Sequence, residues 1–192
     1  MTSFKKYLAD LGITLPEETP PIGSTKKAEE MAISNIGSLS FMGVLLIGEN
    51  HLDDSVIVVK AYSKWALTNL VLSQPKRDDK GMNDLNTALK TADVLSAYYT
   101  SSFFDEKPHG WGWPFALMEV RGKFGKDFTD RMVAYSFRTI LNNLSESDNQ
   151  DFDAYFLRYL AVGDFVMDPG RAKWPEISEI LNRNGHLMRK AQ

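Results

Sequence analysis

The segment SDNQDFDAYFLRYL, residues 147–160, carries the clearest structural signal in this chain. Its large apolar residues fall at the i, i+3, i+4, i+7 and i+8 positions that form one face of a helix: Phe152, Tyr155, Phe156, Tyr159 and Leu160. Ser147, with Gln150 three residues later, has the pattern of a capping box, and Gly163 suits the end of a helix. The sequence therefore predicts an amphipathic helix that begins near residue 147 and stops at Gly163.

The same periodicity recurs along most of the chain. Further helices are predicted over about residues 3–11, 53–72, 83–102, 114–121, 127–144 and 174–189. Within residues 53–72, the four consecutive β-branched residues 56–59 favour a strand. The apolar run that they begin continues to Leu72 without a turn signal, however, and this is too long for one strand, so we predict a helix. Asp53 is a suitable N-cap for it. The eight prolines lie at the ends of these segments or between them, because a proline inside a helix costs about 3 kcal/mol.

The run of residues 25–47, which has no charge from Met31 onward, is harder to interpret. Ser34, Gly37, Ser40 and Gly43 follow one another at steps of three, and small residues at this spacing allow two helices to pack closely. We predict a buried helix here, with a break near Gly37 or Gly43 as the alternative. The run is too polar for a membrane span, which needs about 20 predominantly apolar residues, so no membrane association is expected.

These patterns together predict an all-α fold. Asn-Gly, the strongest hairpin signal, occurs only at Asn184-Gly185, inside a helical pattern, so no strand pair is expected. We predict one domain over residues 1–192, a compact multi-helix bundle of about seven or eight helices, in which residues 1–24 form a helix and a Pro-rich connection. The dipeptide Ala-Tyr occurs four times, and its first three occurrences are nearly evenly spaced, so stacked helical hairpins are an alternative to coincidence.

Composition and charge narrow the classes of function. The 192 residues are 43% hydrophobic and 24% charged, with a net charge of −3, so a globular protein is expected and a nucleic-acid partner is not. The chain has no cysteine, which excludes disulfides, thiolate zinc sites and cysteine nucleophiles and fits a cytoplasmic protein. Asp10, Glu17 and Glu18 interrupt any apolar signal-peptide segment.

Catalytic signals are weak. The three histidines, His51, His109 and His186, lie in different regions, and no phosphate-loop, nucleophile-elbow or zinc-helix motif is present. The best cluster is Glu49-Asn50-His51-Leu52-Asp53-Asp54, which contains three carboxylates and one imidazole. These groups suit a hard or borderline metal ion, or a polar loop that ends in a helix cap. We therefore expect no metal and no cofactor, and a small metal-dependent enzyme built around His51 is the alternative.

Two further segments have features of a recognition surface. Residues 107–115 place Trp111 and Trp113 next to glycines and between prolines, where indole rings either fill the core or anchor a partner. Around the start of the first helix described above lie four carboxylates, with no basic residue between Arg138 and Arg158: Glu146, Asp148, Asp151 and Asp153. Acids at a helix start are favoured by the helix dipole, and four of them also form a patch that suits a basic surface.

The sequence thus favours a soluble helical protein whose function is to bind another protein, as an inhibitor, an immunity-type protein or an adaptor. The expected partner is a protein with a basic surface. The expected partner-binding residues are the two tryptophans and the four acids: Trp111, Trp113, Glu146, Asp148, Asp151 and Asp153. No residue is assigned a catalytic role, and no motif is specific enough to carry a family resemblance.

Overall fold

The computed structural model describes residues 1–17, 20–24, 38–41, 44–48, 51–73, 82–108, 112–142 and 152–186. Within these ranges the chain forms seven helices: α1 (Thr2–Asp10), α3 (Ser55–Leu72), α4 (Met82–Phe104), α5 (Trp113–Phe124), α6 (Lys126–Asn142), α7 (Phe152–Met167) and α8 (Trp174–Arg183). The same ranges contain three short strands: β1 (Ile22–Ser24), β2 (Ser38–Phe41) and β3 (Val44–Ile47).

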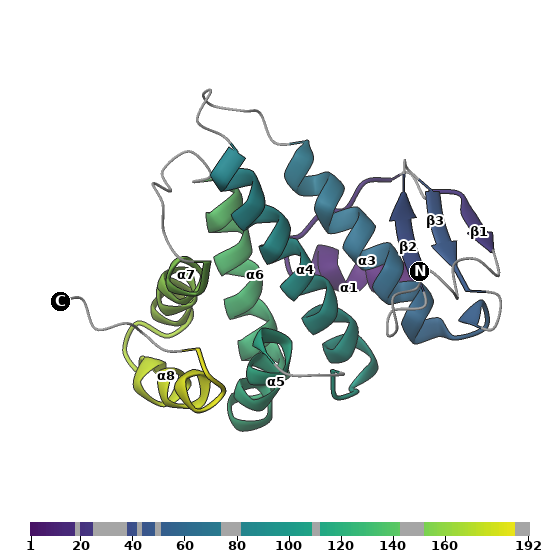
Figure 1. Ribbon diagram of the computed structural model, residues 1–192. Coiled ribbons are helices and arrows are strands. Elements are labelled where there is room, and N and C mark those ends of the chain that lie inside the picture. Colours follow the sequence, from purple (N-terminus) through teal and green to yellow (C-terminus); the bar gives the residue numbers. More distant parts are fainter. Residues whose placement is uncertain are drawn as a thin grey trace.

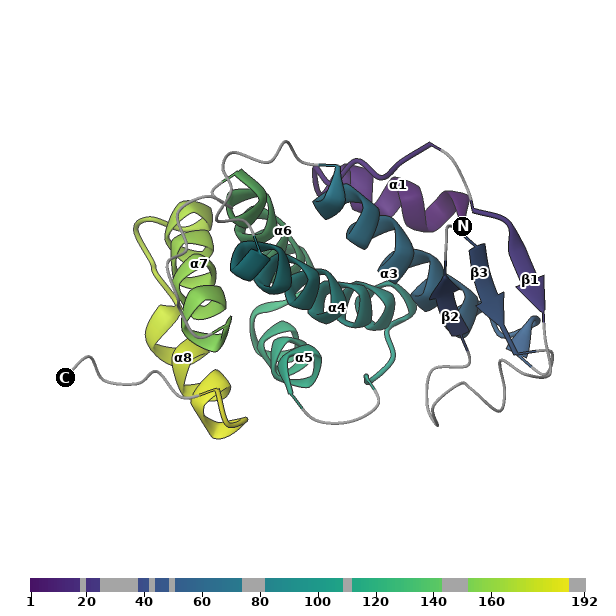
Figure 2. The ribbon, with the colours of Figure 1, turned by 45° about the horizontal axis from the view of Figure 1, so that its top comes forward.

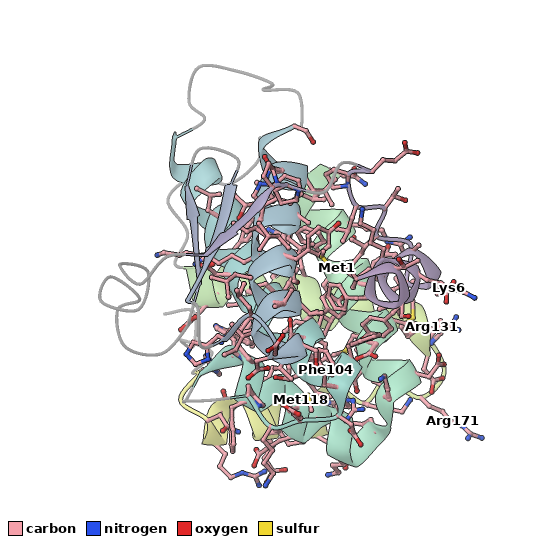
Figure 3. All side chains as sticks on the ribbon, turned by 90° about the vertical axis from the view of Figure 1, so that its right-hand side faces the viewer. Met1, Lys6, Phe104, Met118, Arg131 and Arg171 are labelled. Carbon is pink, nitrogen blue, oxygen red and sulfur yellow. The ribbon has the colours of Figure 1, made fainter. Side chains whose placement is uncertain are left out.

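The helices form a bundle, as the sequence predicts. α3 packs mainly against α4, α6 packs mainly against α7, and α5 lies against α4, α6 and α8. Figures 1 and 2 show α7 and α8 at one end of the molecule and the strands at the other, with α1 beside α3. Phe104 and Met118 pack partly buried against the core, whereas Lys6, Arg131 and Arg171 point outward along one edge (Figure 3).

The predicted N-cap of the helix over residues 53–72 lies one residue before the observed one. Asp54, rather than Asp53, is the N-cap of α3, and its Oδ1 accepts hydrogen bonds from the backbone N–H groups of Val56 (2.9 Å) and Ile57 (3.2 Å). Two donors at the open end of the helix are satisfied in this way. The prediction of an acidic cap is confirmed, and the prediction of Asp53 as that cap is wrong by one residue.

Gly163 does not end α7, so that part of the prediction is wrong. A Cβ at this position would lie 2.7 Å from Ser136 Oγ and 2.8 Å from the Met132 carbonyl oxygen, both on α6. Glycine is therefore needed for close packing of two helices rather than for a helix stop, and α7 continues to Met167. The predicted capping box, Ser147 and Gln150, lies outside the described residues.

The helix predicted over residues 174–189 is shorter than expected. α8 ends at Arg183, and Gly185 follows with a φ of +86°, a conformation that glycine adopts readily. The backbone N–H of His186 then donates to the carbonyl oxygen of Leu181 at 3.0 Å, in the manner of a helix C-terminal cap. Asn184-Gly185 therefore marks the end of the helix.

The strands contradict two predictions: the helix over residues 25–47 and the absence of paired strands. The strand order is β1-β3-β2, with β1 parallel to β3, so that Ile22 lies opposite Leu45, and β2 antiparallel to β3, so that Phe41 lies opposite Val44. Residues 38–41, Ser-Leu-Ser-Phe, alternate polar and apolar side chains with the period of a strand. The three-residue spacing of small side chains concealed this alternation, and residues 25–37 lie outside the described residues.

β3 is the central strand, and this explains its composition. Val44, Leu45, Leu46 and Ile47 form a continuous apolar run, and the side chains of Leu45 and Ile47 are fully buried. β1 lies in the segment predicted as a Pro-rich connection, directly after Pro20 and Pro21.

Among the described helices, none combines the length and the apolar character that crossing a membrane requires.

Candidate functional site

The structure brings together one residue from each of the two segments that the sequence singles out. Trp113 is the first residue of α5, where Gly112 serves as the N-cap with a φ of +108°, and Pro114 follows in the first turn. Its indole ring is buried, with 5% of the residue exposed. The indole Nε1–H donates to Oδ1 of Asp153 in the first turn of α7, at a distance of 2.7 Å. This hydrogen bond joins the starts of two helices that are 40 residues apart in sequence.

Two more rings complete this group, which we call the Trp113 cluster: Trp113, Asp153, Phe156 and His186. Phe156 of α7 meets the indole edge to face, with 4.7 Å between ring centroids. His186, in the turn after α8, stacks on the indole at 3.8 Å with an interplanar angle of 24°. The cluster therefore connects α5, α7 and the end of α8, and α7 and α8 lie at the end of the molecule opposite the strands (Figure 1).

The cluster is polar on one side and exposed there. The side chain of Asp153 is 41% exposed, and its Oδ2 lies 3.9 Å from Nδ1 of His186. His186 itself is only 7% exposed, and its Nε2 has no hydrogen-bond partner within the described part of the chain. Burial lowers the pKa of His186, and the negative charge of Asp153 opposes this effect only in part.

The predicted site residues have different outcomes. Trp113 fills the core, which is one of the two interpretations that the sequence leaves open for the tryptophans. Asp153 lies at a helix start, where an acid is favoured by the helix dipole. Trp111, Glu146, Asp148 and Asp151 lie outside the described residues. The predicted site did not include His186, although the Asn184-Gly185 pair directly before it signals a turn.

A second polar centre lies inside the bundle, where α1, α4 and α6 meet. Asp130 of α6 is 2% exposed, and its carboxylate accepts hydrogen bonds from three hydroxyl groups. The donors are Tyr98 (2.6 Å to Oδ1), Tyr7 (2.7 Å to Oδ2) and Ser102 (2.8 Å to Oδ1). We call this group the Asp130 centre. Sequence analysis did not identify it, but Asp130 occupies the same helical stripe as Val133 and Phe137, and a carboxylate on an apolar stripe is a detectable signal.

The tyrosines of the Asp130 centre remain donors over the ordinary pH range. Burial raises the pKa of Tyr7 and Tyr98, and the negative charge of Asp130 raises each pKa further. The neighbouring Lys126 donates to the backbone carbonyl of Ser102 at 2.6 Å and lies over the ring of Tyr7, 5.2 Å from its centroid. Because its hydroxyls satisfy the carboxylate within the core, we interpret this centre as a structural element of the bundle.

The alternative site around His51 gains no support from the described residues. Asp54 is used as the cap of α3, and Glu49 and Asn50 lie outside the described residues. In the part of the chain that the structure describes, no group of three or more histidine, aspartate or glutamate side chains could hold a metal ion.

A shallow pocket of about 290 Å³ lies between α5 and α8, and charged side chains form most of its wall. It is lined by Glu119, Lys123, Glu179, Ile180 and Arg183. Glu119 accepts hydrogen bonds from Asn184 (2.7 Å) and Arg183 (3.2 Å), and the first of these bonds is the main reason why the pKa of Glu119 is lowered. Lys123 pairs with Glu176 at 2.6 Å. Most of the charge in this pocket is therefore compensated within the protein.

Comparison with models of known protein families, with curated protein sequences and with solved structures finds no match to this chain.

Proposed function

We propose that this protein binds another protein, and that the docking site comprises the start of α7, the acidic residues before it and the neighbouring start of α5. The hydrogen bond from Trp113 to Asp153 is the observation that carries this proposal. It joins one residue of the tryptophan segment to one residue of the acidic segment, and the sequence indicates these two segments separately. The proposed role is that of an inhibitor, an immunity-type protein or an adaptor, and the lack of cysteine supports a cytoplasmic location.

The charge of this region suggests the chemistry of the partner. Four acidic residues occur between residues 146 and 153, and the side chain of Asp153 is partly exposed to solvent. A patch of this sign attracts a basic protein surface, and its main effect is on the rate of association and on partner selection. Since Trp113 is buried, its role is to position Asp153, and Trp111 is the candidate for an apolar anchor.

The proposal is tested by a charge reversal in the acidic segment, Asp148→Lys with Asp151→Lys. The tagged wild-type chain is used to capture proteins from its native source, and each captured protein is purified and its association rate is measured at several salt concentrations. The matched control, Asp10→Lys with Asp53→Lys, changes the net charge equally at two exposed positions outside α7. A specific partner that binds the wild type and the control, but associates more slowly with the first variant and with a weaker salt dependence, supports the proposal.

Two results would contradict it. One is a captured partner whose association rate and salt dependence are the same for both variants and the wild type. The other is a partner that loses binding equally with the two variants, because that result reports net charge rather than this surface.

A further inference from the structure

We infer that His186 is a pH-sensitive contact: when neutral, its ring binds the turn after α8 to the starts of α5 and α7, and when protonated it leaves this position. The inference concerns the Trp113 cluster alone and does not depend on the proposed docking function. It rests on three features of the imidazole: its stacking, the surroundings of its two nitrogens, and its burial.

Stacking makes His186 the main side-chain contact of this turn. The imidazole lies flat on the indole of Trp113 at 3.8 Å, and only 7% of the residue is exposed. The left-handed Gly185 turns the chain after α8, and the backbone N–H of His186 bonds to the Leu181 carbonyl. Removal of this ring from its site would therefore free residues 185–186 from α7 and from the start of α5, while the hydrogen bond from Asn184 to Glu119 (2.7 Å) would still hold the beginning of the turn to α5.

The two ring nitrogens have different surroundings. Nδ1 faces Oδ2 of Asp153 at 3.9 Å, so we assign the proton of the neutral imidazole to Nδ1. Nε2 then carries the lone pair, is buried, and has no hydrogen-bond partner among the described residues. Because no described residue accepts from Nε2, protonation would turn this nitrogen into a buried, charged N–H donor without an acceptor in the described part of the chain, which is an unfavourable state for a polar group.

Charged groups around the ring do not reverse this preference. From α7 the ring faces Asp153, which favours the protonated form, and from the start of α5 it faces the backbone of Gly112, which has the same effect. From the neighbouring part of α8, Arg183 pairs with Glu119 of α5. Burial outweighs the two favourable groups, so the pKa of His186 is lowered.

The sign of the pH dependence follows from this shift. An unfolded histidine has a pKa of about 6.5, and the folded pKa is lower, so the folded state binds fewer protons between the two values. The contact is complete above pH 6.5 and is lost as the pH falls through the lowered pKa. The open form, in which the imidazole reaches water, takes up the proton.

The test compares the full wild-type chain with His186→Phe, which retains a flat ring for the indole but does not titrate. Amide hydrogen exchange of residues 184–186 is measured at pH 7.5 and pH 5 and corrected for the intrinsic pH dependence of exchange. We expect the corrected exchange to rise in the wild type and to stay nearly constant in the variant, because only the wild-type ring can take up a proton between these two pH values. Amides of α4 serve as an internal control for global unfolding.

A second measurement decides the question even if the variant does not fold. The histidine ring signals of the wild type are followed by NMR from pH 8 to pH 4.5 and assigned with single substitutions of His51 and His109. A His186 signal that titrates below pH 6.5, together with faster exchange at residues 184–186, supports the inference. A His186 signal that titrates at or above pH 6.5 overturns it, and so does an equal rise in exchange in the wild type and in His186→Phe.

Discussion

The Asp130 centre and the Trp113 cluster are both built from a helical carboxylate and aromatic side chains, yet they differ in how completely their polar atoms are paired. Asp130 is 2% exposed and receives hydrogen bonds from three hydroxyls, all within 2.8 Å at their closest oxygen. Asp153 receives the indole N–H of Trp113, while the nearby Nε2 of His186 has no partner in the described residues. A fully paired centre inside the core stabilises one arrangement, whereas an incompletely paired cluster at the edge can respond to protons or to a partner.

The largest expected effect is in the Asp130 centre. Asp130→Ala leaves the hydroxyls of Tyr7, Tyr98 and Ser102 unpaired in the core, and we expect the free energy of unfolding to fall by about 4 to 6 kcal/mol, since each unpaired buried group costs about 1–3 kcal/mol. Urea denaturation followed by circular dichroism measures this change. Asp130→Asn, which retains one acceptor, and Asp127→Asn on the exposed side of α6 are the controls. A loss below about 1 kcal/mol for Asp130→Ala would show that the centre does not stabilise the bundle.

Phe156→Ala tests the packing part of the Trp113 cluster. The ring is fully buried against Trp113, and truncation of a buried phenylalanine typically costs about 3–5 kcal/mol. Phe165→Ala, on the same helix, is the matched control because that side chain is 61% exposed, and its change should stay within about 0.5 kcal/mol. Similar losses for both variants would contradict the observed orientation of α7.

A pair of smaller substitutions compares the polar contacts of the two regions directly. Tyr98→Phe removes one donor to the buried Asp130, and we expect a loss of about 1.5–3 kcal/mol, the usual range for a hydrogen bond to a charged group. Asp153→Asn retains an oxygen that accepts from Trp113, and its other oxygen lies at a half-exposed position, so we expect less than about 1 kcal/mol. Equal losses for the two variants would show that the polar contacts of the Asp130 centre and of the Trp113 cluster do not differ in strength.

The smallest expected effect belongs to a surface ion pair outside both regions. Lys64 of α3 lies 2.8 Å from Asp93 of α4, and both side chains are about half exposed. Exposed pairs contribute little because water screens them, so Lys64→Ala should change the free energy of unfolding by less than about 0.5 kcal/mol. The same urea experiment provides the value. A larger loss would mean that α3 and α4 depend on this pair more than on their apolar contacts.

The bundle was predictable where one physical signal acted alone. In α4 and α6 the apolar residues repeat with the helical period, and no other pattern competes with it. In β2 the spacing of small residues favoured a helix, while the alternation of Ser38, Leu39, Ser40 and Phe41 favoured a strand. Pairing with β3 decides between the two, and β3 pairs in turn with β1, which lies about 20 residues earlier in the chain.

The candidate site was predictable only in part, for a related reason. Trp113 and Asp153 stood out because their local composition is unusual, but their contact depends on how α5 and α7 pack. His186 adds its ring from a third segment, and Tyr7 and Tyr98 meet Asp130 from two other helices. Local patterns in a single sequence do not predict contacts between residues of distant segments. A carboxylate on the apolar stripe of α6 nevertheless indicates that hydroxyl or cationic partners must be present.

The contact between Tyr7 and Asp130 also has a consequence for the order of events during synthesis. The two residues are 123 positions apart, so a ribosome that adds about 5–20 residues per second makes Asp130 roughly 6 to 25 seconds after Tyr7. Throughout that interval the hydroxyl of Tyr7 has no Asp130 carboxylate to donate to. α1 is thus among the first segments to be made, but its side-chain contact with α6 can form only after this interval.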